Sequence, residues 1–256
     1  MIREEIDKNI EKDRYNLRSQ KSLLNGAKLQ FAYSDSIPLI FRAPYSYYEE
    51  SISSIVKPSH NILELGSGSG LHTKSLLLTG AKVTATDIAP ISLELLELGL
   101  RADFGKQLST AVADMECLPF EDESFDVVTS AGSLSYGDLS KVTSEIIRVL
   151  KNGGYFICVD SFNHNPIYRL NRYLHYLRGE RSYSTLQRMP DKKTIKFLEN
   201  HFRTVVVNYF GIFTFSGRIL SKFVGNQKAA KILNNMDLRM SFLRKYSFKI
   251  VILATK

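Results

Sequence analysis

The stretch 61-NILELGSGSG-70 places three glycines at alternate positions directly after a short apolar run. The apolar half is typical of a buried β-strand, and the glycines permit a tight turn at which a ligand can approach the backbone closely. A helix-compatible segment follows at residues 71–79. A strand, a glycine-rich turn and a helix in this order predict the first unit of a nucleotide-binding α/β fold.

The rest of the chain repeats this alternation of strand and helix. Short apolar runs predict strands at residues 62–65, 82–86, 109–113, 125–130, 155–160, 203–209 and 246–255. Helices are predicted at residues 71–79, 91–100, 139–150 and 191–200, and another at 45–56 after breaks at Pro38 and Pro44. The alternation implies right-handed crossovers and a doubly wound α/β fold with a mainly parallel sheet.

Composition and periodicity suggest one main domain with additions. The chain has 256 residues, 44% of them hydrophobic, which is enough for one well-buried α/β domain. Apolar side chains recur at helical intervals in residues 3–30, so residues 1–58 are expected to form an N-terminal helical extension that packs on the core. Residues 59–256 would form the main domain. Two basic segments, at about 163–190 and 212–244, interrupt the alternation of strands and helices in this domain and are expected to form a helical cap.

Positive charge is concentrated in the last part of the chain. Residues 61–150 contain 6 Lys+Arg and 13 Asp+Glu, a balance of −7, whereas residues 151–256 contain 19 and 5, a balance of +14. This excess suits an anionic partner, namely nucleic acid, an anionic membrane surface or a small acidic substrate. A solvated basic face has the same composition and is the alternative.

The sequence predicts a cytoplasmic location. No apolar run approaches the roughly 20 residues that cross a bilayer, and the N-terminus is too charged for a signal peptide. Cys117 and Cys158 lie in apolar stretches without neighbouring metal ligands. They are therefore expected to be buried free thiols in a reducing compartment, and no metal site is predicted.

Three kinds of ligand site compete for the glycine turn. A P-loop requires G-x-x-x-x-G-K-[ST], and the spacing of Gly70 and Lys74 excludes it. A dinucleotide fingerprint requires glycine at position 71, where Leu71 stands, so that alternative fits poorly. The third interpretation rests on Glu64, whose carboxylate suits a cationic ligand. S-adenosylmethionine meets this requirement, because it carries ammonium and sulfonium groups and no phosphate.

Acidic residues at the next two strand ends favour the third interpretation. Asp87 follows the strand at residues 82–86 and can accept hydrogen bonds from both hydroxyls of an adenosine ribose. Asp114 can accept a hydrogen bond from the adenine amino group, and Met115 can pack on the adenine ring. Three acids at the ends of three successive strands, beside a glycine turn, predict a site for S-adenosylmethionine.

In these segments the sequence resembles the class I S-adenosylmethionine-dependent methyltransferases. The resemblance covers about residues 59–162 and rests on LELGSGSG, ATD, ADMECLPFEDESFDVV and RVLKNGGYFICVD. It implies a Rossmann-like sheet of seven strands, with the last strand inserted antiparallel between the fifth and the sixth. Asn152 stands where the family commonly has proline, and Gly153 and Gly154 still permit that turn.

The family pattern also implies which residues hold the cofactor S-adenosylmethionine. Glu64 and the glycine turn would surround the methionine end, Asp87 would bind the ribose, and Asp114 with Met115 would hold the adenine. Residues 130–133 would pass under the methyl donor. The predicted cofactor-binding residues are Glu64, Gly66, Ser67, Gly68, Gly70, Asp87, Ile88, Asp114, Met115 and Ser130.

The acceptor is expected over the ends of the fourth and fifth strands, where the loops read SAGSLSYGD and DSFNHNPIYRLNR. His164 is the candidate general base for a hydroxyl acceptor, and Tyr136 and Asp160 are further candidate catalytic residues. A turn at His164-Asn165-Pro166, capped by Asp160, is the alternative. The predicted acceptor-binding residues are Ser133, Tyr136, Asp138, Asn163, Tyr168, Arg169 and Arg172.

Arginines after the fifth strand indicate the charge of the acceptor. Arg169 and Arg172 project to one face of a helix, and Arg178 and Arg181 extend this basic surface. The surface suits a small anionic acceptor, while an exposed charged helix is the alternative. The loops SAGSLSYGD and NHNPIYRLNRYLHYLRGERS also resemble methyltransferases of bacterial surface-polysaccharide pathways, which favours O-methylation of a sugar.

Two other functions are compatible with the same predicted S-adenosylmethionine-binding core. A C-methyltransferase for a quinone-like or lipid substrate would use the basic, apolar segment around residues 213–242 for peripheral contact with a membrane. A non-catalytic S-adenosylmethionine-binding partner protein is the other alternative. Nucleic acid is not the expected partner, because the chain has no recognised RNA-binding module and lacks an [ND]-P-P-[YF] motif.

Overall fold

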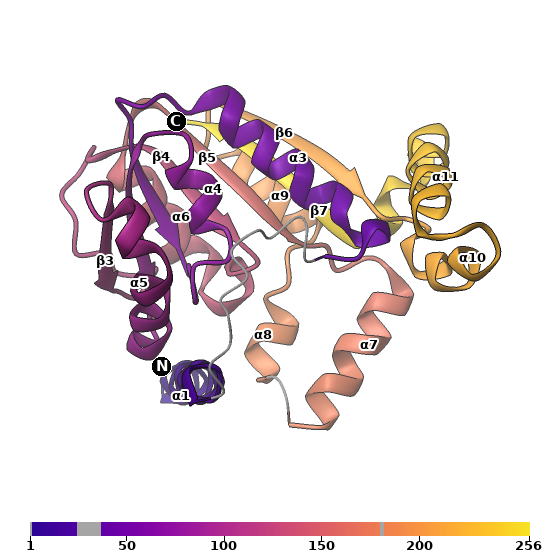
Figure 1. The fold of residues 1–256 in the computed structure, drawn as a ribbon, viewed down its shortest axis with the longest axis horizontal. Helices are drawn as coiled ribbons and strands as arrows, with labels where there is room; N and C mark the ends of the chain where they lie inside the picture. Colours follow the sequence, from indigo (N-terminus) through magenta and orange to yellow (C-terminus); the bar gives the residue numbers. More distant parts are fainter. Residues whose placement is uncertain (1, 25–36, 180–181) are drawn as a thin grey trace.

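A computed structural model describes residues 2–24, 37–179 and 182–256, which form a seven-stranded sheet covered by helices on both faces (Figure 1). The strands are β1 Asn61–Leu65, β2 Lys82–Asp87, β3 Leu108–Val112, β4 Phe125–Ala131, β5 Leu150–Ser161, β6 Thr204–Phe210 and β7 Lys249–Thr255. Their spatial order is β3-β2-β1-β4-β5-β7-β6. Each predicted strand is present, but β5 begins at Leu150 rather than at residue 155 and β7 begins at Lys249 rather than at residue 246. The other bounds differ by at most one residue.

The sheet is mainly parallel, as predicted. Strands β1 to β5 pair in parallel, whereas β7 pairs antiparallel with both β5 and β6. The prediction of a Rossmann-like sheet with an inserted antiparallel last strand is therefore confirmed. Because parallel strands end at the same edge of a sheet, the segments that follow β1, β2, β3 and β4 lie close together.

Two apolar cores hold helices against the two faces of the sheet. On one face, α3 Leu39–Ile55, α4 Thr73–Leu77 and α5 Pro90–Phe104 bury Ile52, Leu76 and Leu96. On the other face, α6 Leu139–Val149 and α9 Lys192–Glu199 bury Ile146 and Leu198. Each such side chain stabilises the fold by roughly 1.5–3 kcal/mol when it is fully buried.

The expected helix break at Pro44 is wrong. Helix α3 begins at Leu39, directly after Pro38, and contains Pro44 in its interior. Pro44, Tyr48 and Ile52 are spaced four residues apart and are all buried. Burial of this stripe against the sheet compensates for the backbone hydrogen bond that a proline inside a helix removes.

The late segments of the chain form further helices at one end of the sheet (Figure 1). After β5 come α7 Pro166–Leu177 and α8 Tyr183–Gln187, and after β6 come η2 Thr214–Ser216, α10 Gly217–Val224, α11 Asn226–Arg239 and η3 Ser241–Tyr246. Helix α8 contacts η1 Leu134–Tyr136, whereas α11 contacts α10 and α3. None of the helices formed by the described residues has the length and hydropathy needed to cross a membrane.

The N-terminal helix α1, Ile2–Leu24, packs against α5 and α8 and is seen nearly end-on below α5 in Figure 1. The predicted helix over residues 3–30 is present over this range, and residues 25–30 lie outside the described residues. This contact brings α1 to the edge of the sheet where the parallel strands end.

The two cysteines have different environments. Cys158 is a buried free thiol in β5, whereas Cys117 is a free thiol at the surface. The prediction of a buried thiol is therefore wrong for Cys117. The amide of Cys117 donates to the carbonyl oxygen of Asp114 at 3.0 Å, and this narrow turn leaves the side chain outside the core.

Candidate active site

The glycine turn after β1 depends on backbone angles that favour glycine. Gly66, Gly68 and Gly70 have φ values of 64°, 54° and 86°, a region in which other residues are strained. The amide of Gly68 donates to Asp87 Oδ2 at 2.8 Å, and the amide of Ala89 donates to Asp87 Oδ1 at 2.8 Å. Asp87 therefore ties the glycine turn to the end of β2.

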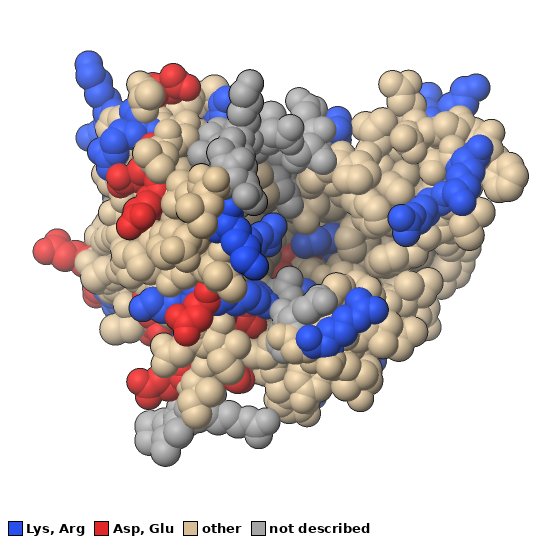
Figure 2. Space-filling view, turned by 60° about the horizontal axis from the view of Figure 1, so that its bottom comes forward, with Lys and Arg blue, Asp and Glu red and all other residues tan. Residues whose placement is uncertain are grey.

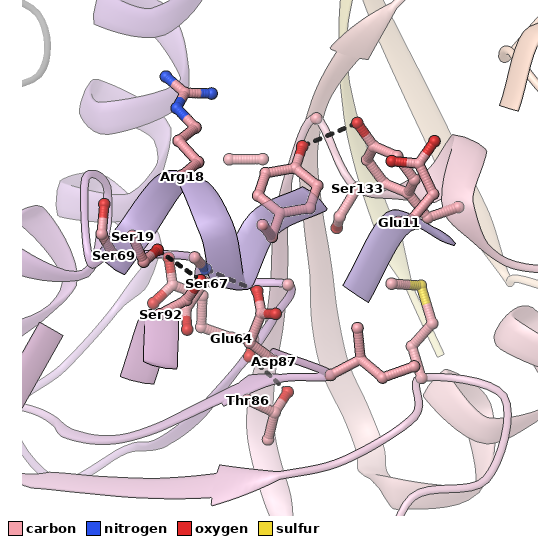
Figure 3. A pocket seen from close by; sticks show the side chains of 18 of the residues that line it. Glu11, Arg18, Ser19, Glu64, Ser67, Ser69, Thr86, Asp87, Ser92 and Ser133 are labelled. Atoms are coloured by element: carbon pink, nitrogen blue, oxygen red, sulfur yellow. Dashed lines mark hydrogen bonds between the residues drawn. The ribbon is translucent and has the colours of Figure 1, made fainter. Parts of the chain in front are cut away.

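A cavity of about 640 Å³ lies beyond the carboxyl ends of β1, β2 and β4. This volume falls in the range of about 300–1,000 Å³ that is usual for small-molecule sites. Figure 3 shows the side chains of Glu64, Ser67 and Asp87 close together at the strand ends, with Arg18 of α1 pointing away from them. Eight predicted cofactor residues border the cavity: Glu64, Gly66, Ser67, Gly68, Asp87, Ile88, Asp114 and Met115.

Glu64 is a buried carboxylate on the wall of this cavity. Burial raises the pKa of Glu64 to about 7, nearby Asp87 adds to the rise, and a hydrogen bond from Thr73 opposes it. The Thr73 hydroxyl donates to Glu64 Oε2 at 2.6 Å. A cationic ligand in the cavity would compensate for the cost of ionising this buried group.

Ser67 provides a second sign that the cavity holds a polar ligand. Its Oγ is buried and has no hydrogen-bond partner among the described residues. A Cβ added to Gly68, the next residue, would meet no atom within 4 Å, so the turn leaves open space there. Buried polar atoms normally have a partner, and both observations fit S-adenosylmethionine beside the glycine turn.

Helix α1 forms the opposite wall, and sequence reasoning did not place it there. Lys8 Nζ lies 2.6 Å from Asp114 Oδ2 and 2.8 Å from Glu116 Oε2. Ser19 Oγ lies 2.9 Å from Ser92 Oγ in α5. The cavity residues that the sequence did not reveal include Lys8, Glu11, Tyr15, Arg18, Ser184, Thr185 and Arg188 from α1 and the α8 region.

Two tyrosines meet where α1 reaches η1. The hydroxyls of Tyr15 and Tyr136 lie 2.8 Å apart, and the Arg14 guanidinium donates to Tyr136 Oη at 3.4 Å. Both tyrosines border the cavity. Tyr136 is the one candidate catalytic residue from the sequence that the structure brings to the predicted cofactor residues.

Of the other residues predicted near the methyl donor, Ser133 lines the cavity, whereas Ser130 and Gly70 lie directly behind its wall. Ser133 borders the cavity, and its Oγ donates to the carbonyl oxygen of Leu65 at 2.9 Å. Ser130 lies outside the lining, with its Oγ 2.6 Å from Ser133 Oγ. Gly70 also lies outside it, and a Cβ there would stand 2.8 Å from Leu96 Cγ. Gly70 therefore lets the turn pack closely on α5.

His164 lies outside the cavity lining. Its Nε2 accepts a hydrogen bond from the amide of Lys192 at 3.2 Å, and its ring lies 4.8 Å from the ring of Phe162. Burial lowers the pKa of His164. Asn165 caps α7 by accepting from the amides of Ile167 and Tyr168, which agrees with a turn at His164-Asn165-Pro166.

Asp160, Asp138 and Asn163 also lie outside the cavity lining. The buried Asp160 accepts hydrogen bonds from the amides of Leu134 at 3.1 Å and Ser161 at 2.6 Å, so it holds η1 in place. Asp138 caps α6. The amide of Asn163 donates to the carbonyl oxygen of Pro190 at 2.8 Å. These contacts stabilise the loops around the cavity.

The arginines of α7 divide into two groups. Arg172 and Tyr168 border a second, smaller cavity between α1 and α7, whereas Arg169 and Arg178 are exposed and lie outside it. Arg181 lies outside the described residues.

His72, directly before α4, borders the main cavity. Burial lowers its pKa to about 3, and Lys249 acts in the same direction. Its ring stacks on Tyr45 with centroids 5.7 Å apart. The imidazole is therefore neutral at physiological pH and packs against α3.

Known proteins resemble this chain through the segment that forms the cavity. A family model described as "Methyltransferase domain" matches residues 63–158. A demethylmenaquinone methyltransferase of Lactococcus lactis subsp. lactis is 30% identical over 169 residues, which cover 58% of this chain and 67% of the relative. A sterol 4-C-methyltransferase of Caenorhabditis elegans is 35% identical over 125 residues, covering 47% and 37%. The chain spans less than half the length of the first curated relatives that it matches.

Solved structures resemble the chain over a longer range. The geranyl diphosphate C-methyltransferase of Streptomyces coelicolor A3(2), in complex with Mg²⁺, geranyl diphosphate and S-adenosyl-L-homocysteine, has a TM-score of 0.57 at 17% identity. The match covers 82% of this chain and 77% of that chain. At this identity the likeness concerns the fold alone.

Proposed function

This chain belongs to the class I S-adenosylmethionine-dependent methyltransferases, and we propose that it transfers a methyl group from S-adenosylmethionine to a small-molecule acceptor. One observation carries the proposal: the glycine turn, Glu64, Asp87 and Asp114 all border the cavity that α1 covers. Glu64 would face the cationic end of the cofactor, and Asp87 and Asp114 would accept hydrogen bonds from its adenosine.

Catalysis in such a cavity requires mainly alignment. When bound, S-adenosylmethionine supplies a methyl group that its sulfonium already activates. The protein then has to hold the acceptor in line and exclude water. Helices α1 and α8 line the cavity on the side opposite the strand ends and would help to exclude water.

The direct test of the proposed function is calorimetric titration with S-adenosylhomocysteine, with NAD as the control ligand. We expect micromolar binding of S-adenosylhomocysteine and none of NAD. Binding of neither ligand would contradict the proposal, and binding of NAD alone would support the dinucleotide alternative for the glycine turn.

Cofactor binding should depend on pH through Glu64. Because its pKa is about 7, the group carries a proton below pH 7, and a cationic ligand must displace this proton. The affinity for S-adenosylhomocysteine, which keeps the ammonium group, should therefore rise between pH 6 and 7.5, by up to about tenfold. Glu64→Gln should remove this dependence, as measured by calorimetry at several pH values.

Glu97→Gln is the matched control for this experiment. Glu97 lies outside the cavity, and hydrogen bonds from Arg101 and Thr110 lower its pKa, so it stays ionised between pH 6 and 7.5. The control variant should keep the wild-type pH profile. An identical, steep profile in Glu64→Gln would show that another group is responsible.

For the acceptor we propose a sugar or acidic saccharide that is methylated on oxygen, as the loop sequences favour. A hydroxyl acceptor needs a partner that orients it and takes its proton. The paired hydroxyls of Tyr15 and Tyr136, 2.8 Å apart on the cavity wall, support this assignment. His164 is the competing candidate from the sequence.

Two variants distinguish these candidates. If Tyr136 contacts the acceptor, Tyr136→Phe should lower kcat by roughly 100-fold, within the range of a lost acid–base group, and leave the affinity for S-adenosylhomocysteine unchanged. His164→Ala should then keep most of its turnover. Steady-state kinetics with a sugar acceptor give the answer, and loss of turnover in His164→Ala alone would assign the base to His164.

A second candidate function is C-methylation of a quinone-like or lipid acceptor at a membrane surface. Ile219 and Phe223 on α10 and Phe242 on η3 are 66%, 81% and 73% exposed. Seven Lys and Arg lie in residues 212–246, against the single acid Asp237. Apolar side chains with basic neighbours suit an anionic bilayer. Sedimentation with anionic vesicles tests it, and Phe223→Ser should reduce the bound fraction.

The cytoplasmic location and the single main domain with its two late insertions also stay predictions. The insertion after β5 fits the proposed reaction, because it contributes Ser184, Thr185 and Arg188 to the cavity wall.

A further inference from the structure

A second cavity adjoins the first between α1 and α7. Its volume is about 350 Å³. Arg14 and Arg18 border it from α1, and Arg172 and His175 border it from α7. Tyr15 and Arg18 border both cavities, so the two spaces meet at these side chains. The smaller one is called the α1–α7 pocket below.

The α1–α7 pocket has basic side chains and no acidic ones among the described residues that line it. Lys8 and Arg14 of α1 are paired with carboxylates. In contrast, Arg18 and Arg172 form no ion pair with any carboxylate of the residues that the structure describes. Figure 2 shows Lys and Arg side chains around the hollow of this face.

Arg172 is held in position without an ion pair to a described carboxylate. Burial raises the pKa of Asp160, and the charges of Lys249 and Arg172 oppose this rise from beyond ion-pair distance. Its Nε donates to Met189 Sδ at 3.3 Å, and its guanidinium carbon lies 5.9 Å from the ring centre of Tyr168. The Tyr168 hydroxyl in turn lies 2.6 Å from Ser161 Oγ at the end of β5. Among the described residues these contacts orient the guanidinium without a hydrogen bond to its terminal nitrogens, which can therefore face an anion.

The location of the pocket relates it to the acceptor. Tyr15 lies on the boundary of the two cavities, and its hydroxyl is 2.8 Å from that of Tyr136. A molecule whose reactive atom lies near Tyr136 can therefore extend past Tyr15 and reach Arg172 with its far end. Guanidinium groups bind phosphate oxygens through paired, charge-assisted hydrogen bonds.

We propose that the acceptor carries a phosphoryl group, and that this group binds in the α1–α7 pocket between Arg18 and Arg172. Asn171 and His175 provide further polar groups around it. The inference rests on the proposed function, because it identifies the bound phosphoryl compound with the methyl acceptor. The phosphoryl group belongs either to a soluble phosphate ester or to a lipid headgroup.

The experiment titrates the protein, saturated with S-adenosylhomocysteine, with inorganic pyrophosphate in a calorimeter. A parallel arm measures sedimentation with phosphatidylcholine vesicles that contain phosphatidic acid. The test variant is Arg18→Gln/Arg172→Gln. The matched control is Arg178→Gln/Arg203→Gln, which removes the same charge from exposed positions outside both cavities.

The test variant should bind pyrophosphate at least tenfold more weakly than the wild type, while the control should change by less than about twofold. Loss of vesicle binding in the test variant alone also supports the pocket and assigns the phosphate to a lipid. Equal losses in both variants, or no loss in either arm, would overturn the inference.

A separate readout distinguishes failure of the inference from failure of the proposed function. S-adenosylhomocysteine binding without site-dependent binding of pyrophosphate or vesicles would overturn the α1–α7 pocket and leave the methyltransferase proposal intact. Absence of S-adenosylhomocysteine binding would contradict the proposed function, and pyrophosphate would then be titrated into the unliganded protein to decide on the pocket by the same comparison.

Discussion

Asp87→Asn is expected to weaken the binding of S-adenosylhomocysteine by roughly 100-fold or more. The carboxylate borders the cavity at the end of β2, where it would accept hydrogen bonds from both ribose hydroxyls. Hydrogen bonds to a charged group contribute about 1.5–3 kcal/mol each, and 1.4 kcal/mol corresponds to a tenfold change in affinity. Burial also raises the pKa of Asp87, which a ligand that donates two hydrogen bonds would counteract.

Calorimetry at fixed pH measures the effect, and thermal unfolding shows whether the variant is folded. Asparagine keeps one side-chain oxygen that can accept from the amide of Gly68, so the glycine turn should persist. Asp103→Asn removes a carboxylate from the exposed face of α5 and should bind as the wild type does. An affinity loss below threefold in Asp87→Asn would show that the ribose binds elsewhere.

Gly66→Ala should abolish cofactor binding and also reduce the stability of the protein. A Cβ at this position would stand 2.6 Å from Ser133 Cβ and 2.9 Å from Ser133 Oγ. Ser133 cannot easily move away, because its Oγ contacts both Ser130 and the carbonyl oxygen of Leu65. The positive φ of 64° adds about 1–2 kcal/mol of strain.

Gly153→Ala separates backbone strain from the crowding at Gly66. Gly153 has a φ of 77°, but a Cβ there would meet no atom within 4 Å. Gly153→Ala should therefore be destabilised only by the backbone strain, which lowers Tm by about 2–4 °C for each kcal/mol in a chain of this size. It should keep its affinity for S-adenosylhomocysteine. Equal effects of the two substitutions on affinity would contradict the assignment of Gly66 to the cofactor site.

The sequence was sufficient for the sheet and for one wall of the cavity, because both depend on local patterns. Asp87 ends a strand, Gly66, Gly68 and Asp114 follow one within three residues, and parallel strands bring such positions to one edge. The order of the strands then determines which of these residues meet. No contact between distant helices is needed for that inference.

The opposite wall could not be predicted, because it depends on contacts between distant parts of the chain. Lys8 and Asp114 are separated by 106 residues, and Tyr15 and Tyr136 by 121. The pattern in α1 indicates an amphipathic helix but not the surface that it covers. The sequence nevertheless contained a signal for this wall. The polar residues Lys8, Glu11, Tyr15 and Arg18 are spaced three and four residues apart, so they lie on one face of α1.

The position of His164 was also hard to predict, although it depends on contacts between residues that are closer together in the sequence. The loop after β5 is rich in polar residues, but its sequence does not determine which side chains turn toward the cavity. The structure uses Asn165 to begin α7 and joins His164 to the amide of Lys192 at the start of α9. With these local hydrogen bonds, His164 lies outside the lining of the main cavity, and its role as a base stays a prediction.

The surface position of Cys117 has a practical consequence for measuring ligand binding. The chain contains two cysteines, and Cys158 is buried, so a thiol-reactive fluorophore should attach to the folded protein at one site. Cys117 is joined by a backbone hydrogen bond to Asp114, which borders the cavity. If Asp114 holds the adenine as proposed, a dye at this thiol should report arrival and departure of the cofactor in real time, without a radioactive substrate or an identified acceptor.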